Sequence, residues 1–212
     1  MIRAGIIGGA GYTAGELIRL LVNHPQVRLA FVHSTSNAGN RIADVHGGLE
    51  GDTEMRLSDA YDLQAIDVLF LCSAHGESRK WLEAHDVPAG VKIIDLAQDF
   101  RDESDGFVYG LPELNRDRIR TAERVANPGC FATAIQLALL PLAAAGLLTG
   151  EVHVTAVTGS TGAGVKPSAT THFSWRTDNI SVYKAFTHQH LIEIGRNLRR
   201  LQPGFGKAVN FV

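Results

Sequence analysis

The sequence predicts an α/β fold built on a parallel sheet. In the first half of the chain, short apolar runs with strand character alternate with helix-forming segments. The runs are continuous rather than alternating, which is typical of parallel strands covered on both faces. A glycine-rich turn joins the first run to a helix, in which Leu17, Leu20 and Leu21 are expected on one buried face. We expect strands at residues 2–7, 27–32, 66–72 and 91–96, and a further helix at residues 77–84.

The composition is that of an ordinary soluble globular protein. The chain has 212 residues, a formal net charge of −2, 45% hydrophobic residues and 20% charged residues. No Lys/Arg-rich segment indicates nucleic-acid binding, and no apolar run reaches membrane-spanning length. The N-terminus enters an apolar strand without a signal-peptide layout, and Cys72 and Cys130 lie far apart without metal-ligand spacing. We therefore expect a cytoplasmic protein that binds neither nucleic acid nor membrane.

The first turn has the context of a dinucleotide phosphate-binding loop. Residues 8–15 read GGAGYTAG, a variant of the GxGxxG fingerprint that stands between a strand and a helix. Glycines let the backbone approach a pyrophosphate, and the helix N-terminus supplies N–H donors. The alternative is a tight turn of any α/β protein, but the flanking elements favour nucleotide binding. The candidate cofactor contacts here are Gly8, Gly11, Tyr12, Thr13 and Ala14.

The end of the second predicted strand indicates which dinucleotide is bound. An NAD site usually has an Asp or Glu there, which binds the ribose 2′-hydroxyl. This chain has no acidic residue between Glu16 and Asp44. Hydroxyl groups and a nearby arginine stand where the acidic residue would be, and these groups tolerate or bind a 2′-phosphate. The sequence therefore favours NADP(H) over NAD(H), with Ser34, Thr35, Ser36 and Arg41 as candidate contacts.

The loops after the third and fourth strands supply further candidates. Ligands bind at the carboxyl ends of strands in such sheets, so Ser73 and His75 are expected beside the cofactor. Cys72, at the end of its strand, is most simply a core residue. Asp99 and Arg101 either pair structurally or orient the site, and the sequence does not separate these interpretations.

Cys130 follows a Pro128-Gly129 turn and precedes a long uncharged apolar stretch, residues 131–145. This pattern places the cysteine at or just inside the N-terminus of a buried helix. There the helix dipole and unpaired N–H groups favour a thiolate, which is a nucleophile. The alternative is a small buried cysteine that packs the helix start. Pro141 falls within the stretch, so we expect the helix to be kinked or broken there.

Two later segments have open interpretations. Residues 158–164, TGSTGAG, do not lead into a hydrophobic helix, so they are either a substrate loop or a plain connection. His188 and His190 point to one face if the chain is extended and diverge if it is helical. No third ligand with suitable spacing lies nearby, so we expect no metal site. A histidine at a helix start is either a partner for a thiolate or a surface residue.

The chain resembles the N-acetyl-gamma-glutamyl-phosphate reductases, NADPH-dependent enzymes of arginine biosynthesis in the semialdehyde dehydrogenase superfamily. The motifs occur in the family's order over essentially the whole chain: GGAGYTAGEL, IDLAQDFR, YGLPELNR, ANPGC, GSTGAG and HQHLIEI. The resemblance implies a Rossmann-type NADP-binding domain at residues 1–128. It also implies an α/β catalytic domain on a mixed sheet, here residues 129–212.

The resemblance also implies the reaction. N-acetyl-glutamyl 5-phosphate would be reduced by NADPH to the 5-semialdehyde, with loss of phosphate, through a thioester on Cys130. His190, in preference to His188, would be the acid/base. The protein would be a homo-oligomer, dimer or tetramer, acting on a small acyl phosphate. The expected substrate contacts are Arg101, Asn127, Ser160 and Gly162.

Some positions depart from the family pattern. Phe131-Ala132 stands where Tyr-Pro is frequent, and Thr35 replaces a common arginine. Relatives continue beyond the equivalent of Val212, so the catalytic domain is expected to be incomplete and activity of the chain alone is in doubt. The alternatives are a reductase of N-succinyl-glutamyl or aminoadipyl phosphate, or an NADP-binding protein without turnover.

Overall fold

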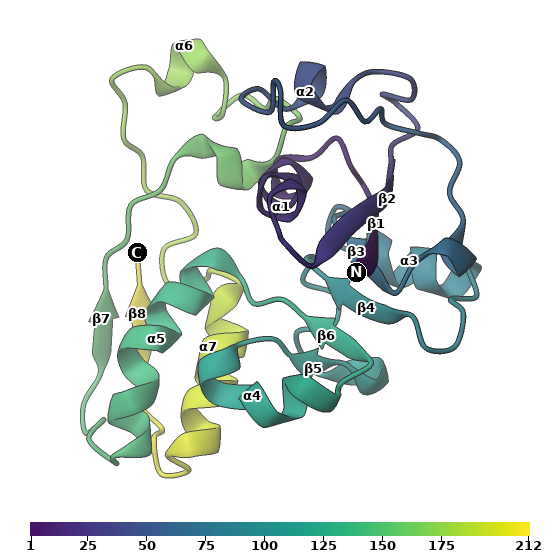
Figure 1. Ribbon diagram of the computed structural model, residues 1–212. Helices are drawn as coiled ribbons and strands as arrows, with labels where there is room; N and C mark the ends of the chain where they lie inside the picture. Colours follow the sequence, from purple (N-terminus) through teal and green to yellow (C-terminus); the bar gives the residue numbers. More distant parts are fainter. The chain divides into compact units, whose positions relative to one another are not determined.

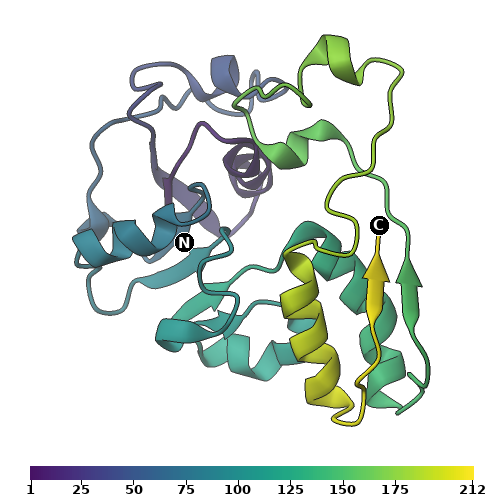
Figure 2. The same cartoon turned by 180° about the vertical axis from the view of Figure 1, so that it is seen from behind.

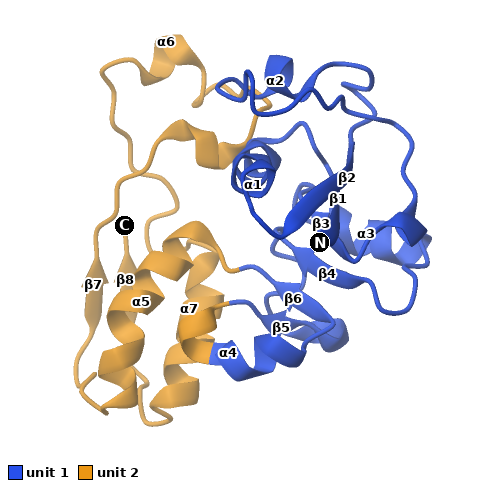
Figure 3. Ribbon diagram, viewed as in Figure 1, with its two compact units in different colours: residues 1–110, 115–127 blue, residues 111–114, 128–212 orange.

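The computed structural model describes residues 1–212, which form two compact units. The first unit contains residues 1–110 and 115–127, and the second contains residues 111–114 and 128–212 (Figure 3). None of the helices in the structure is both long enough and apolar enough to cross a membrane.

The first unit is built on a six-stranded sheet in the order β2-β1-β3-β4-β6-β5, in which every neighbouring pair is parallel (Figure 1). β1 lies between β2 and β3, so the chain leaves β1 toward one side and later returns to the other. Such a reversal places a ligand crevice at the carboxyl ends of the strands. The strands are β1 Ile2–Ile7, β2 Val27–His33, β3 Val68–Leu71, β4 Lys92–Asp95, β5 Val108–Tyr109 and β6 Arg124–Ala126.

Helices cover both faces of this sheet. α1, Tyr12–Val22, packs Ile18 and Leu21 into a core with β1 and β2. α3, Glu77–Ala84, packs Trp81 and Leu82 against the other core, which includes residues of β3 and β4. The prediction that Leu20 lies on the buried face of α1 was wrong. Leu20 is 70% exposed, and Ile18 is buried in the core instead. The unit also contains α2, Ile42–Val45, and most of α4, Pro112–Thr121.

The second unit contains two packed helices, α5 Cys130–Ala144 and α7 His190–Leu201. Figures 1 and 2 show them side by side. Their interface holds a buried polar pair, in which Asn197 donates to the Gln136 side-chain oxygen at 2.6 Å. The parallel strands β7, Val152–Val154, and β8, Val209–Phe211, and the short helix α6, Phe173–Arg176, complete the unit.

α5 is continuous through Pro141, so the predicted break does not occur. Pro141 lies in the last turn, and only three residues follow it before the helix ends at Ala144. Leu140 and Ala143 beside it are buried, and their packing favours the helical path.

Candidate active site and cofactor site

The glycine turn after β1 is shaped by close backbone contacts. Gly8 has a φ of +83°, and a Cβ on it would lie 2.8 Å from backbone atoms of Cys72. A Cβ on Gly9 would lie 2.4 Å from the Val32 side chain, and the Gly9 N–H donates to the His33 carbonyl at 2.8 Å. Both positions therefore require glycine, and the turn lies between the ends of β2 and β3.

The start of α1 fits an anionic ligand. Its N-cap, Gly11, provides no side-chain cap, and no acidic residue stands in the first turn. Tyr12 and Thr13 are exposed, so the first N–H groups have no competing side-chain acceptor. This is the arrangement that holds a pyrophosphate at a helix N-terminus. Ala14, also predicted to contact the cofactor, is fully buried.

His46, which was not predicted as a site residue, supports this turn. Its Nε2 lies 2.6 Å from the Gly9 carbonyl oxygen, and since a carbonyl only accepts, the ring donates from Nε2. The ring is buried, and a Cβ on Gly15 would lie 2.6 Å from its Nδ1. Gly15 thus lets His46 pack directly on α1 and fix the glycine turn.

The loop after β2 carries the hydroxyl groups of Ser34, Thr35 and Ser36. Ser34 is buried and lies 3.5 Å from the Ser36 hydroxyl, while Thr35 and Ser36 are exposed. Arg41, the predicted cationic contact of the cofactor, is already paired with carboxylates. Its guanidinium lies 3.1 Å from the Glu54 carboxylate and 4.0 Å from that of Asp44.

The loops after β3 and β4 are bonded to each other. The Gln98 N–H donates to His75 Nδ1 at 3.2 Å. The Asp99 carboxylate accepts from the Gly76 N–H at 2.7 Å and from the Arg79 N–H at 3.1 Å, which caps the start of α3. Asp99 therefore fixes the loop that contains the predicted cofactor contacts Ser73 and His75.

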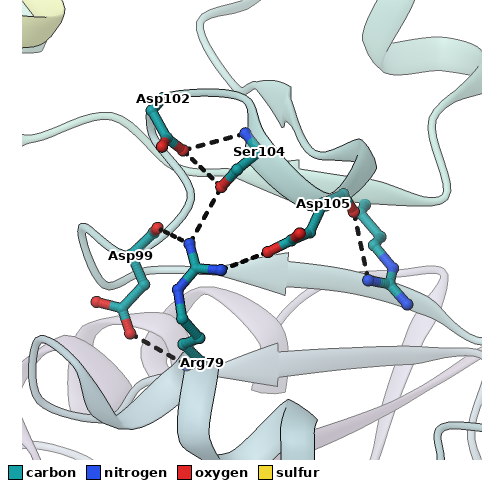
Figure 4. Close-up of polar contacts among 6 residues, drawn as sticks. Arg79, Asp99, Asp102, Ser104 and Asp105 are labelled. Carbon is teal, nitrogen blue, oxygen red and sulfur yellow. Dashed lines mark hydrogen bonds and ion pairs between the residues drawn. The ribbon is translucent and has the colours of Figure 1, made fainter.

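Arg79 extends this connection to the loop between β4 and β5, which contains Asp99, Ser104 and Asp105 (Figure 4). Its guanidinium donates to the Asp99 carbonyl at 2.8 Å and to the Ser104 hydroxyl at 3.1 Å, and it pairs with the Asp105 carboxylate. The Ser104 hydroxyl in turn donates to Asp102 at 2.7 Å. These contacts link the loop between β4 and β5 to α3.

Arg101 and Asn127 lie together at the carboxyl ends of β4 and β6. The Arg101 Nε donates to the Asn127 carbonyl at 2.9 Å, and the Asn127 N–H donates to the Asp95 carbonyl at 2.8 Å. Arg101 is buried, whereas Asn127 is exposed. Burial raises the pKa of Asp95, which the nearby Arg101 opposes. The structure thus brings together two of the predicted substrate contacts within the first unit.

In the second unit, Cys130 is the first residue of α5 and is exposed to solvent. Its helix has no side-chain cap and no acidic residue in the first turn. Exposure excludes the alternative of a buried packing cysteine. Cys72 provides the contrast, because burial, reinforced by the Asp95 carboxylate, raises the pKa of its thiol to about 12. Cys130 is therefore the cysteine placed for nucleophilic chemistry.

Glu193 connects the start of α5 to α7. Its carboxylate accepts a hydrogen bond from the Gly129 N–H at 3.2 Å and lies 4.0 Å from His190 Nε2. All three residues are buried. A Cβ on Gly129 would lie 2.3 Å from His190 Nε2, so only glycine permits this packing. Glu193 was not predicted from the sequence, although it follows His190 by three residues in a predictable helical segment.

The two histidines lie in contact although only one is helical. His190 begins α7, and its N–H donates to His188 Nδ1 at 3.2 Å. Their ring centroids are 4.4 Å apart, and Phe131 packs edge-on against both. Burial and the Lys184 charge lower the pKa of His188, which Glu193 opposes. The lowered pKa favours the neutral form of His188, whose Nδ1 accepts the His190 N–H.

Tyr183 is a further residue that the sequence analysis missed. Its ring packs edge-on against His188 at 5.8 Å, and burial together with the nearby Cys130 charge raises the pKa of its hydroxyl. Ser160 and Gly162 lie instead in an exposed 3-10 turn, Ser160–Ala163, and neither forms a hydrogen bond with Cys130, His188 or His190.

Comparisons with known proteins agree with this division of the chain. Residues 3–122 match the family model "semialdehyde dehydrogenase, NAD binding domain", and residues 130–212 match "semialdehyde dehydrogenase, dimerisation domain". An N-acetyl-gamma-glutamyl-phosphate reductase of Bacteroides thetaiotaomicron is 63% identical over all of this chain. The chain spans 66% of that relative's length.

Solved structures show the same fold at low sequence identity. Aspartate semialdehyde dehydrogenase II of Vibrio cholerae, complexed with ASA, is 18% identical with a TM-score of 0.72, covering 100% of this chain and 69% of that one. The Candida albicans enzyme with NADP has a TM-score of 0.62 at 17% identity, covering 92% and 58% respectively. The chain belongs to the semialdehyde dehydrogenase family, among the N-acetyl-gamma-glutamyl-phosphate reductases.

Proposed function

We propose that the protein reduces N-acetyl-glutamyl 5-phosphate to N-acetyl-glutamate 5-semialdehyde and phosphate, with NADPH as reductant. The observation that carries this proposal is the exposed Cys130 at the first position of α5, with His190 packed against the preceding Gly129. The names of the similar reductases supply the acyl group. The place in arginine biosynthesis is inferred from the family resemblance of the sequence motifs.

The first half of the reaction follows from the position of Cys130. Its thiolate forms a bond to the acyl carbon, and the N–H groups at the start of α5 stabilise the oxyanion of the tetrahedral intermediate. When the carbonyl re-forms, the carbon–oxygen bond to phosphate breaks and phosphate leaves. The product on the protein is a thioester to Cys130.

The second half requires a hydride and a proton. NADPH, when bound, supplies the hydride. His190 protonates the oxyanion of the hemithioacetal on Cys130 and then takes the same proton back as the aldehyde leaves with the thiolate restored. We assign this role to His190 because His188 already uses Nδ1 to accept the His190 N–H.

The first unit supplies the residues that would hold the cofactor. The cradle at Gly8 and Gly9, which a Cβ would fill, and the uncapped start of α1 fit a pyrophosphate. The hydroxyl groups of Ser34, Thr35 and Ser36 fit a ribose 2′-phosphate rather than a free 2′-hydroxyl, since no carboxylate is present in that loop. Ser73 and His75 would contact the nicotinamide half.

Arg101, Asn127, Ser160 and Gly162 remain proposed substrate contacts. Arg101 has the only charged side chain of these four residues. Its guanidinium would bind the phosphate or the carboxylate of the substrate. Exposure of the Ser160–Ala163 turn leaves its hydroxyl and N–H groups available to a ligand.

We also infer a cytoplasmic homo-oligomer. Two unpaired cysteines suit a reducing compartment. The match to a dimerisation domain supports self-association. Exposed apolar side chains in the chain segment that connects β7 to α7 support it too: Phe173 is 81% exposed, Ile180 is 84% exposed and Val182 is 70% exposed.

The test is the reverse reaction, followed as NADPH formation from NADP⁺ and phosphate with a panel of semialdehydes. N-acetyl-glutamate 5-semialdehyde is expected to be oxidised faster than its N-succinyl and one-carbon-longer counterparts. Preference for either counterpart would reassign the substrate. No NADPH formation with any of the three, from protein that binds NADP⁺, would leave the chain as a binding protein without turnover.

A further inference from the structure

An extended strip beside β2, residues 55–58, lies against the loop that follows that strand. The Ser34 N–H donates to the Ser58 carbonyl at 2.9 Å, and the Gly39 N–H donates to the Leu57 carbonyl at 2.8 Å. Leu57 also donates back, to the Asn40 carbonyl at 2.9 Å. The strip is therefore fixed to both ends of the hydroxyl-bearing loop.

Side chains alternate along this strip, which determines where Arg56 points. Leu57 is 2% exposed and belongs to the core around α1, whereas Arg56 is exposed. The Arg56 Nη1 donates to the Gly39 carbonyl at 2.7 Å. Its guanidinium thus lies against the loop that carries the Ser34, Thr35 and Ser36 hydroxyl groups.

Arg41 and Arg56 face each other across an antiparallel bridge but differ in charge balance. Arg41 is paired with Glu54 at 3.1 Å and lies 4.0 Å from Asp44. Arg56 has no carboxylate partner within 4.0 Å, and its hydrogen bond goes to a neutral carbonyl. Of the two arginines, Arg56 carries the uncompensated positive charge beside this loop.

We propose that Arg56 binds the 2′-phosphate of NADP(H) and sets the preference for this cofactor over NAD(H). This inference rests on the proposed function. A guanidinium that donates one N–H to Gly39 keeps further donors for phosphate oxygens, and the loop hydroxyl groups add neutral donors.

The experiment measures dissociation constants of NADPH and NADH for the 212-residue chain and its variants by fluorescence titration. Arg56→Ala is expected to weaken NADPH binding about tenfold to a hundredfold, the range of a charge-assisted hydrogen bond, and to leave NADH binding unchanged. Arg56→Lys keeps part of the NADPH affinity. Arg28→Ala, an exposed arginine on β2, controls for the change in net charge.

Each outcome decides the assignment. A matching loss in Arg41→Ala with none in Arg56→Ala would overturn the proposal and return the role to Arg41. Equal losses for NADPH and NADH in Arg56→Ala would overturn it too, because the residue would then support the loop and not the phosphate. Failure of the unaltered chain to bind either dinucleotide would instead overturn the proposed function, and this inference with it.

Discussion

The Glu193 carboxylate accepts a hydrogen bond from the Gly129 N–H at 3.2 Å and lies 4.0 Å from His190 Nε2. One buried acid on α7 thus contacts both the residue that precedes Cys130 and the proposed acid/base. Because it reaches the reacting groups only through these two residues, we regard Glu193 as a positioning residue.

Glu193→Gln tests the charge separately from the hydrogen bond. The amide oxygen still accepts the Gly129 N–H, but the negative charge that favours protonated His190 is lost. We expect kcat to fall about tenfold and the acidic limb of the kcat/KM profile to move to lower pH. Glu193→Ala additionally leaves the Gly129 N–H unsatisfied and should cost about 1–3 kcal/mol of unfolding free energy. An unshifted pH profile in Glu193→Gln would restrict the residue to a structural role.

Gly129→Ala tests the packing of His190 on the helix start. The new Cβ would lie 2.3 Å from His190 Nε2, so the imidazole must move. We expect a loss of kcat and about 1–3 kcal/mol of stability, the usual range for overpacking. Gly150→Ala is the matched control, since a Cβ there meets no atom within 4 Å. Equal behaviour of the two variants in activity and denaturant titration would contradict the described packing.

His190→Asn and His188→Asn distinguish the two histidines. Loss of a general acid/base lowers kcat about 10²–10⁴-fold, which we expect for His190→Asn. His188→Asn retains an acceptor for the His190 N–H, so kcat should change only a few-fold. Steady-state rates of both variants decide this, and a larger loss in His188→Asn would exchange the two roles.

The stability of the fold should depend on pH through His188. Burial and Lys184 lower the pKa of this histidine in the folded state, against the opposing effect of Glu193. The unfolded state therefore binds protons first as the pH falls below about 6.5, and the stabilisation present above that pH is lost. We expect the urea midpoint to drop between neutral and mildly acidic pH, and to drop less in His188→Asn. An identical pH dependence in that variant would exclude this contribution.

The local features of the fold were predictable from sequence, whereas its long-range contacts were not. The strand, glycine turn and helix at the N-terminus follow from residues close in sequence, as does Cys130 at a helix start. Leu20 was misplaced because packing against the sheet, not the local apolar pattern, selects the buried face of α1. His46 and Glu193 bond to glycines 37 and 64 residues away, and no local pattern indicates such pairs.

The central claim is that Cys130 forms a thioester with the substrate, and Cys130→Ser tests it most directly. Phosphate-dependent NADP⁺ reduction and NADPH binding are measured on this variant beside Cys72→Ala, which removes a buried thiol with no proposed role in the reaction. We expect Cys130→Ser to lose turnover and to bind NADPH as before, and Cys72→Ala to keep turnover. Retained reductase activity in Cys130→Ser would contradict it.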